Sequence, residues 1–342
     1  MSDTATNDFD ESIKNNEDPI AIVYHQIPVW LLSVWVVFPV LAIMVIVIAW
    51  IFVYTYRNKP IVAMSQPEFL YNICVGALLI ASHMLFYLPV ALSNNHDTDI
   101  KPLGLHVCCN LSLWSWYIGY ILVDSALLCK IYRIKLITDQ PLRRGLMILP
   151  KHVMGPYIAI IVITVGILIA WTAVHPDKFK TIELDPDTNE NIGLCLLDSD
   201  NTIHSENTLD IVFSQTLAGL IMIVEIILLV LAWKIRHVNQ ELGDSKRIFR
   251  LMLYQLIIHI MYIIFFQTSR FWKIKASVAV SIKILLLDVM FPFFNSIGMV
   301  IFLIVPRMYN VWYEHKHGHL PENVDMIGGG RTTVQGVNPG DN

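Results

Sequence analysis

Charged side chains are scarce in this chain of 342 residues. They make up 15% of the sequence, whereas soluble domains carry about 25%. Catalytic motifs are missing as well: the chain has no H-E-x-x-H, no G-x-S-x-G, no phosphate-binding glycine loop followed by lysine and no C-x-x-C pair. The low charge argues against a soluble protein, and the missing motifs argue against an enzyme. No cofactor, metal site or nucleic-acid partner is expected.

Long apolar segments are present instead, and there are seven of them. A helix needs about 20 residues to cross roughly 30 Å of hydrocarbon, and every segment passes this test. Stretches such as ILIAWTAV and IMIVEIILLVLAW are apolar nearly all round, as lipid-facing helices are. The sequence predicts an all-α membrane protein, a seven-transmembrane helix bundle within residues 27–312, with spans near 27–56, 67–92, 106–132, 153–174, 209–233, 248–271 and 277–305.

The loop charges predict the orientation of the bundle. The segment before the first span is acidic, whereas the loop between spans three and four is basic, and basic loops stay in the cytosol. The N-terminus is therefore expected outside and the C-terminus inside, although Arg270, Lys273 and Lys275 in the last external loop oppose the rule. No cleavable signal peptide is visible. We expect residues 1–26 to be a disordered acidic extracellular segment and residues 313–342 to be a disordered cytosolic tail.

Short motifs at the edges of the spans carry a family resemblance. They are MSQP at 64–67, then Cys109, Trp114, Gly119, Lys130 and Arg133 along span three, WTAVHP at 171–176, LAWKIRHV at 231–238, GDSK at 243–246 and FLIVPRMY at 302–309. This ordered series resembles the transmembrane domain of class C G-protein-coupled receptors, most closely the GABA-B type, over nearly all of residues 27–310. The resemblance implies a plasma-membrane receptor that signals through a heterotrimeric G protein.

The chain departs from that family pattern in two ways. The extracellular bilobed ligand domain of amino-acid-binding members does not precede Ile27, so we expect no response to GABA or glutamate from this chain alone. Inside the bundle, Asp124 and Asp288 stand where the GABA-B pattern is apolar, and Tyr132 replaces a tryptophan. The stimulus therefore stays open: a ligand or lipid in the bundle cavity, constitutive activity or an associated subunit.

Two other functions remain in view. The chain could be a non-signalling partner that forms a homo- or heterodimer with another class C receptor and aids its trafficking. It could also be a transporter or ion conductor that uses its buried acidic residues, although the absence of an internal repeat weighs against this. G-protein activation measured beside ion flux separates these classes.

The resemblance also implies roles for particular residues. It pairs Cys109 with Cys195 in an external disulfide, with Cys108 as the competing thiol, and it joins Lys130 to Asp244 in an ionic lock of the inactive state. The loops at 130–152 and 234–247 would face the G protein or anionic membrane lipid, through the basic residues Arg133, Lys135, Arg143, Arg144, Lys246 and Arg247.

Ionisable residues inside the spans form a last candidate group. Each costs about 2.5 to 3.5 kcal/mol at the centre of a membrane helix, so such groups normally face the bundle interior. Counting 1.5 Å per residue puts Asp124 and Glu225 at one depth, where they repel unless one is protonated or a cation lies between them. His83 and Asp288 share another depth and are a plausible pair. The buried polar network is predicted to comprise His83, Asp124, Glu225, His259 and Asp288, either as interhelical hydrogen bonds or as a proton- or ion-sensing site.

Overall fold

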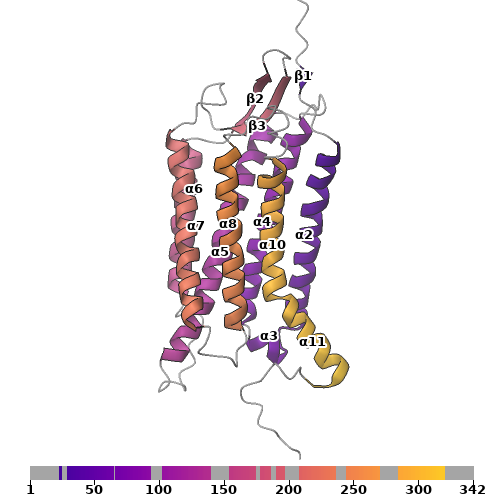
Figure 1. Ribbon diagram of the computed structural model, residues 1–342, viewed down its shortest axis with the longest axis vertical. Helices are drawn as coiled ribbons and strands as arrows, with labels where there is room; N and C mark the ends of the chain where they lie inside the picture. The colour runs from indigo at the N-terminus through magenta and orange to yellow at the C-terminus, as the bar shows by residue number, and fades with distance from the viewer. Residues whose placement is uncertain are drawn as a thin grey trace, which may run out of the picture.

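The computed structural model describes residues 23–24, 29–64, 66–93, 102–139, 154–174, 178–185, 190–196, 208–235, 244–269 and 284–319. Seven helices in these ranges are long and apolar enough to cross a membrane, and they stand side by side in one bundle (Figure 1). The predicted seven-helix bundle is confirmed. The spans are α2 (Val29–Thr55), α4 (Pro67–Ser93), α5 (Pro102–Asp139), α6 (Met154–Val174), α7 (Thr208–Ile235), α8 (Asp244–Ser269) and the segment formed by η4 (Ile284–Met290) and α10 (Phe291–Leu303).

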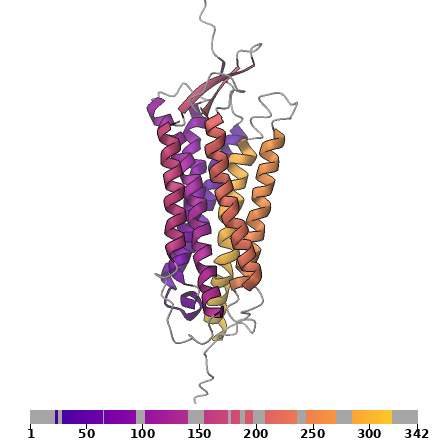
Figure 2. The ribbon, with the colours of Figure 1, turned by 90° about the vertical axis from the view of Figure 1, so that its left-hand side faces the viewer.

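Helix α5 is the centre of the bundle. It packs against α4, α6 and α7, and 56% of its most apolar window is buried, compared with 17% for α6 at the periphery. Figure 2 shows α6 and α7 together on one side of the bundle. Helix α5 also extends beyond the predicted span at 106–132, because its last turns continue past the hydrophobic stretch. The longest helix, α5, therefore runs through the bundle interior and reaches both ends of the bundle.

Two glycines allow α4 and α5 to approach closely. A Cβ atom added to Gly76 would lie 2.7 Å from the Gly119 carbonyl oxygen, and one added to Gly119 would lie 2.9 Å from the Gly76 carbonyl oxygen. Small residues at helix contacts are the usual way in which membrane helices gain packing contacts, since lipid supplies no hydrophobic driving force between them. Gly119 belongs to the motif series, and this contact explains the need for glycine there.

The last span changes its helical geometry within the membrane. Residues of η4 form a π-helix, and α10 follows directly with Pro292 in its first turn. Proline has no backbone N–H to donate to the carbonyl four residues earlier, which is that of Asp288. Isolated π-helical turns are frequent at functional positions, and this one carries Asp288, one of the predicted intramembrane acids.

A small sheet covers one end of the bundle, and the all-α prediction missed it. Strands β2 (Lys178–Asp185) and β3 (Glu190–Leu196) pair antiparallel, and β1 (Val23–Tyr24) pairs parallel with β3. Ile192, Leu194 and Leu196 alternate with smaller or polar residues, which is the period of a strand. The strand β1 also lies within residues 1–26, which were predicted to be disordered; the rest of that prediction lies outside the described residues.

The opposite end carries the short helices α3 (Pro60–Met64) and α11 (Val305–His317) (Figure 1). Helix α11 continues past the boundary predicted at 312, and it ends where Gly318 adopts a left-handed conformation with φ of 73°. Glycine is the residue that most readily ends a helix in this way, so the helix stops at the glycine rather than at the end of the apolar run. Lys59 Nζ lies 3.4 Å from Glu314 Oε2 and links α11 to the α3 region. The remainder of the predicted tail lies outside the described residues.

Candidate functional site

At the sheet-covered end, a disulfide ties the hairpin to the bundle. Cys109 near the start of α5 is bonded to Cys195 on β3, with a Cα–Cα distance of 5.6 Å, and Cys108 takes no part in it. A second link lies beside it, because the Phe179 backbone N–H donates to His106 Nδ1 at 2.8 Å. The predicted disulfide is therefore present in the structure, and it holds β2 and β3 over the start of α5.

Two motif segments from the sequence analysis contact each other next to this end. Trp114 Nε1 on α5 donates a hydrogen bond to Thr172 Oγ1 on α6, 2.9 Å away. Thr172 belongs to the WTAVHP segment, and its hydroxyl also donates to the Leu168 carbonyl within α6. Through this hydrogen bond, two motifs that are distant in the sequence hold the peripheral helix α6 against the central helix α5.

Among the predicted buried polar residues, His83 has a hydrogen-bonding partner on a neighbouring helix. Its Nδ1 lies 2.7 Å from the Ser112 hydroxyl and 3.0 Å from the Ser112 carbonyl oxygen, and its ring packs against Trp116. This nitrogen is thus engaged by Ser112 on α5 rather than by Asp288, the partner expected from depth alone. We call His83 and Ser112 the outer pair. Asp288 itself interacts electrostatically with Tyr262.

A second polar group lies deeper, where α5, α7 and α8 meet. His259 Nδ1 lies 2.8 Å from Glu225 Oε2 and 2.7 Å from Oε1, and its N–H makes the hydrogen bond with Oε2. Asp124, predicted at the same depth as Glu225, interacts with it electrostatically. Both carboxylates are 1% exposed or less. The sequence analysis named all three residues but did not predict that His259 is the partner of Glu225.

Three polar residues that the sequence analysis missed complete this region. Asn295 Nδ2 donates to the Tyr120 hydroxyl, and Gln255 Nε2 lies 3.4 Å from Asn295 Oδ1. Tyr120 also packs against His259, with ring centroids 4.8 Å apart. Neutral polar side chains inside apolar spans were the available signal, but neutral residues are weaker indicators than charged ones.

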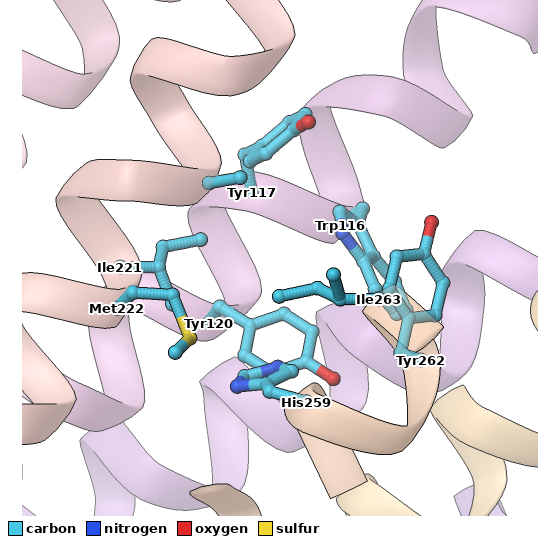
Figure 3. A pocket seen from close by; sticks show the side chains of 9 residues that line it. Trp116, Tyr117, Tyr120, Ile221, Met222, His259, Tyr262 and Ile263 are labelled. Carbon is cyan, nitrogen blue, oxygen red and sulfur yellow. The ribbon is translucent and has the colours of Figure 1, made fainter. Parts of the chain in front are cut away.

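A cavity of about 80 Å³ opens directly above His259. Four aromatic side chains line it, together with His259 and apolar groups of α7 and α8 (Figure 3). The aromatic residues are Trp116, Tyr117, Tyr120 and Tyr262. Tyr120 and His259 lie next to each other in Figure 3, and His259 Nδ1 contacts the Glu225 carboxylate. The cavity is thus lined largely by aromatic side chains, and one of its lining residues, His259, is paired with a buried carboxylate.

The predicted cytosolic residues gather at the α3/α11 end, as far as the structure describes them. Lys130 on α5 is 2% exposed, Lys246 on α8 is exposed, and Arg133, Lys135 and Arg247 are half-buried. Arg307 on α11, a motif residue to which no role had been given, is 1% exposed and donates to the Leu303 carbonyl. Asp244 is the first residue of α8, but its side chain lies outside the described residues, as do Arg143 and Arg144.

Seven spanning helices, a disulfide-anchored hairpin at one end and basic residues at the other define a multi-pass receptor-type bundle. The family model described as "7 transmembrane sweet-taste receptor of 3 GCPR" matches residues 25–307. The chain therefore belongs to the class C G-protein-coupled receptor family, whose members are receptors rather than enzymes, and it is a multi-pass protein of the plasma membrane.

Curated relatives agree with this family. Gamma-aminobutyric acid type B receptor subunit 2 of Homo sapiens and of Rattus norvegicus are each 26% identical to this chain over 198 residues. That alignment covers 56% of this chain and 20% of each relative. The Caenorhabditis elegans subunit 2 is 26% identical over 214 residues, which is 61% of this chain and 24% of the relative. The chain thus spans only about a quarter or less of the relatives that it matches.

Proposed function

We propose that this chain is a GABA-B-like class C receptor that activates a heterotrimeric G protein at the α3/α11 end. One observation carries the proposal: the disulfide and the basic residues at the inner ends of α5 and α8 lie at opposite ends of the bundle. Disulfides persist in oxidising compartments outside the cytosol, whereas basic residues favour the cytosolic side. Two independent signals thus support a cytosolic α3/α11 end and an extracellular N-terminus, with Arg133, Lys135, Arg143, Arg144, Lys246 and Arg247 available to a G protein.

Lys130 and Asp244 are proposed to restrain the inactive state. Lys130 is buried near the cytosolic end of α5, and Asp244 begins α8 at the same end (Figure 1). An outward movement of α8 would separate them. If the contact exists only in the inactive state, each 1.4 kcal/mol that it contributes lowers the active fraction about tenfold.

Nucleotide exchange tests the proposal directly. The purified chain in lipid nanodiscs is mixed with a panel of purified G-protein heterotrimers, and the rate of nucleotide exchange is measured. We expect exchange above the receptor-free rate with at least one heterotrimer, and a loss of this exchange in Lys246→Glu. The matched control is Lys180→Glu on β2, which makes the same charge change at the opposite end and leaves exchange intact. No exchange with any heterotrimer, or equal loss in the two variants, contradicts the proposal.

The lock has its own test. Lys130→Ala and Asp244→Ala should each raise ligand-free exchange, and exchanging the two charges should partly restore the parent rate, because the attraction returns but the local geometry does not. Unchanged exchange in both single variants, at normal surface expression, would show that the residues are two independent helix-end charges.

The names of the relatives favour a second possibility, since each is called a subunit. In this alternative the chain is the non-signalling or trafficking member of a dimer with another class C receptor. Co-expression with candidate class C partners, followed by cross-linking at the cell surface, distinguishes the two. A chain that promotes exchange only in the presence of a partner supports the subunit role, whereas exchange by the isolated chain supports the receptor role.

A further inference from the structure

Three oxygen-bearing side chains lie one helical turn below the aromatic cavity. Asp124 follows Tyr120 by four residues on α5, Glu225 follows Met222 by three on α7, and Gln255 precedes His259 by four on α8. These spacings correspond to about one turn, or about 5.4 Å along the axis. Helices α5 and α7 run in the direction opposite to α8, so all three steps lead away from the cavity in the same direction. We call Asp124, Glu225 and Gln255 the middle layer.

The middle layer holds more acceptor oxygens than donors. Both oxygens of Asp124 and Oε1 of Gln255 are buried and have no hydrogen-bond partner among the described residues. Glu225 has the single His259 N–H for its two oxygens: the hydrogen bond is to Oε2, and Oε1, 2.7 Å from the same nitrogen, has no second donor among the described residues. All three side chains are 1% exposed or less. A buried ionised carboxylate without donors is strongly unfavourable unless a positive charge compensates it or the group takes up a proton.

The neighbouring ionisable groups do not supply enough positive charge. Among the described residues, the ionisable groups that interact with the two carboxylates are His259 on α8 and Tyr120 on α5. His259 contributes at most one positive charge against two carboxylates, and a tyrosine contributes none. Lys130 is six residues beyond Asp124 on the same helix, about 9 Å along the axis. The ionised layer therefore lacks one positive charge.

The unpaired atoms also define the kind of cation. They are all carboxylate or amide oxygens, which favour hard cations over transition metals. No three His, Cys, Asp or Glu side chains converge as metal ligands within the described ranges. Two carboxylates whose charge is partly balanced by an imidazole suit a monovalent cation better than a divalent one, because divalent sites take six or more oxygens. The cavity one turn above, whose lining includes the neighbouring Tyr120 and His259, has room for several waters.

We propose that the middle layer binds one sodium ion, held by Asp124, Glu225 and the Gln255 side-chain oxygen and reached through the aromatic cavity. The ion supplies the missing positive charge and links α5, α7 and α8. This site does not depend on G-protein coupling: it concerns the folded bundle and can be tested in its absence.

Thermal unfolding of the purified chain in nanodiscs is the first test. The midpoint is measured in NaCl, KCl and N-methyl-D-glucamine chloride at equal ionic strength. We expect a saturable rise in sodium that is smaller in potassium and absent in the large organic cation, because only an ion that binds the folded state stabilises it by mass action. Asp124→Asn should lose the rise, and the control Asp288→Asn, which changes another intramembrane acid, should keep it. Equal midpoints in the three salts, or an equal sodium effect in Asp124→Asn, overturn the proposal.

Direct binding to the unmodified chain keeps the proposal testable if Asp124→Asn does not fold. Equilibrium binding of radioactive sodium should saturate at one ion per chain, and unlabelled sodium should displace it. No saturable binding overturns the proposal. Displacement by methylammonium with little effect of unlabelled sodium would assign the site to an organic ammonium ligand, and a midpoint that follows pH but not sodium would assign it to a proton; either result also overturns it.

Discussion

The outer pair and the middle layer are two polar sites on the same helix, and they differ in how completely their groups are hydrogen-bonded. Ser112 on α5 is matched to His83 on α4, whereas Asp124, twelve residues further along α5, has no partner for either oxygen among the described residues. A satisfied pair inside a membrane holds two helices together. An unsatisfied carboxylate in the same environment is costly and is therefore expected to serve a ligand or a change of state.

The largest effect is expected from removing the only donor that Glu225 has in the described part of the chain. His259→Ala leaves a buried carboxylate unpaired, and breaking a buried pair in this way costs about 3–5 kcal/mol. Thermal or denaturant unfolding in detergent measures the loss. His83→Ala is the matched comparison in the outer pair, and it should cost less because Ser112 is neutral. Equal losses would mean that the two sites do not differ as described.

A smaller loss is expected where α4 and α5 touch through glycine. A methyl group at Gly119 would meet the Gly76 carbonyl oxygen and Ile80, so Gly119→Ala should cost about 1–3 kcal/mol through overpacking. Gly219→Ala on α7 is the control, since no atom lies within 4 Å of an added Cβ there. If both variants unfold at the same temperature, close packing through glycine does not hold α4 and α5 together. The hydrogen bond of the outer pair would then be the main contact between these two helices.

Loss of the hydroxyl in the outer pair should have a modest effect. Ser112→Ala removes one neutral hydrogen bond to His83, which contributes about 0.5–1.5 kcal/mol. The unfolding midpoint should fall slightly, and G-protein activation per folded receptor should stay at the parent level. A large change in activation at nearly unchanged stability would place the outer pair among the functional groups.

The smallest effect on stability is expected at Asp124 in sodium-free buffer. Asp124→Asn keeps the size of the side chain and removes a carboxylate without a hydrogen-bond partner in the described chain, so the free energy of unfolding should stay level or increase slightly. The measurement is the unfolding midpoint in N-methyl-D-glucamine chloride. A clear loss of stability would show that Asp124 already has a strong partner.

The fold could be predicted from the sequence because lipid imposes a simple requirement on every span. Length and polarity placed the helices within a few residues, except at α5, whose last turns leave the apolar stretch, and at the last span, whose predicted start at 277 lies outside the described residues. The strands β2 and β3 were missed because a search for long apolar runs does not register the alternation at Ile192, Leu194 and Leu196. The Cys109–Cys195 bond was predicted from the family resemblance, not from the spacing of the cysteines.

The polar sites were predictable by depth but not by direction. The rise per residue predicted Asp124 and Glu225 at one depth, and the two interact electrostatically. It could not give the rotation of each helix about its axis, and this rotation brings Ser112 to His83 and His259 to Glu225. Depth alone suggested Asp288 as the partner of His83. Gln255 and Asn295 were missed because a neutral amide inside a span indicates a polar site only when its neighbours are known.

Basal nucleotide exchange per folded receptor, compared between Asp124→Asn and Ser112→Ala, tests the distinction between the two sites most directly. If the middle layer controls the relation of α5, α7 and α8, Asp124→Asn changes exchange several-fold at preserved stability, while Ser112→Ala lowers stability and leaves exchange per folded receptor unchanged. The opposite pattern, with exchange altered by Ser112→Ala and unaffected by Asp124→Asn, would contradict it.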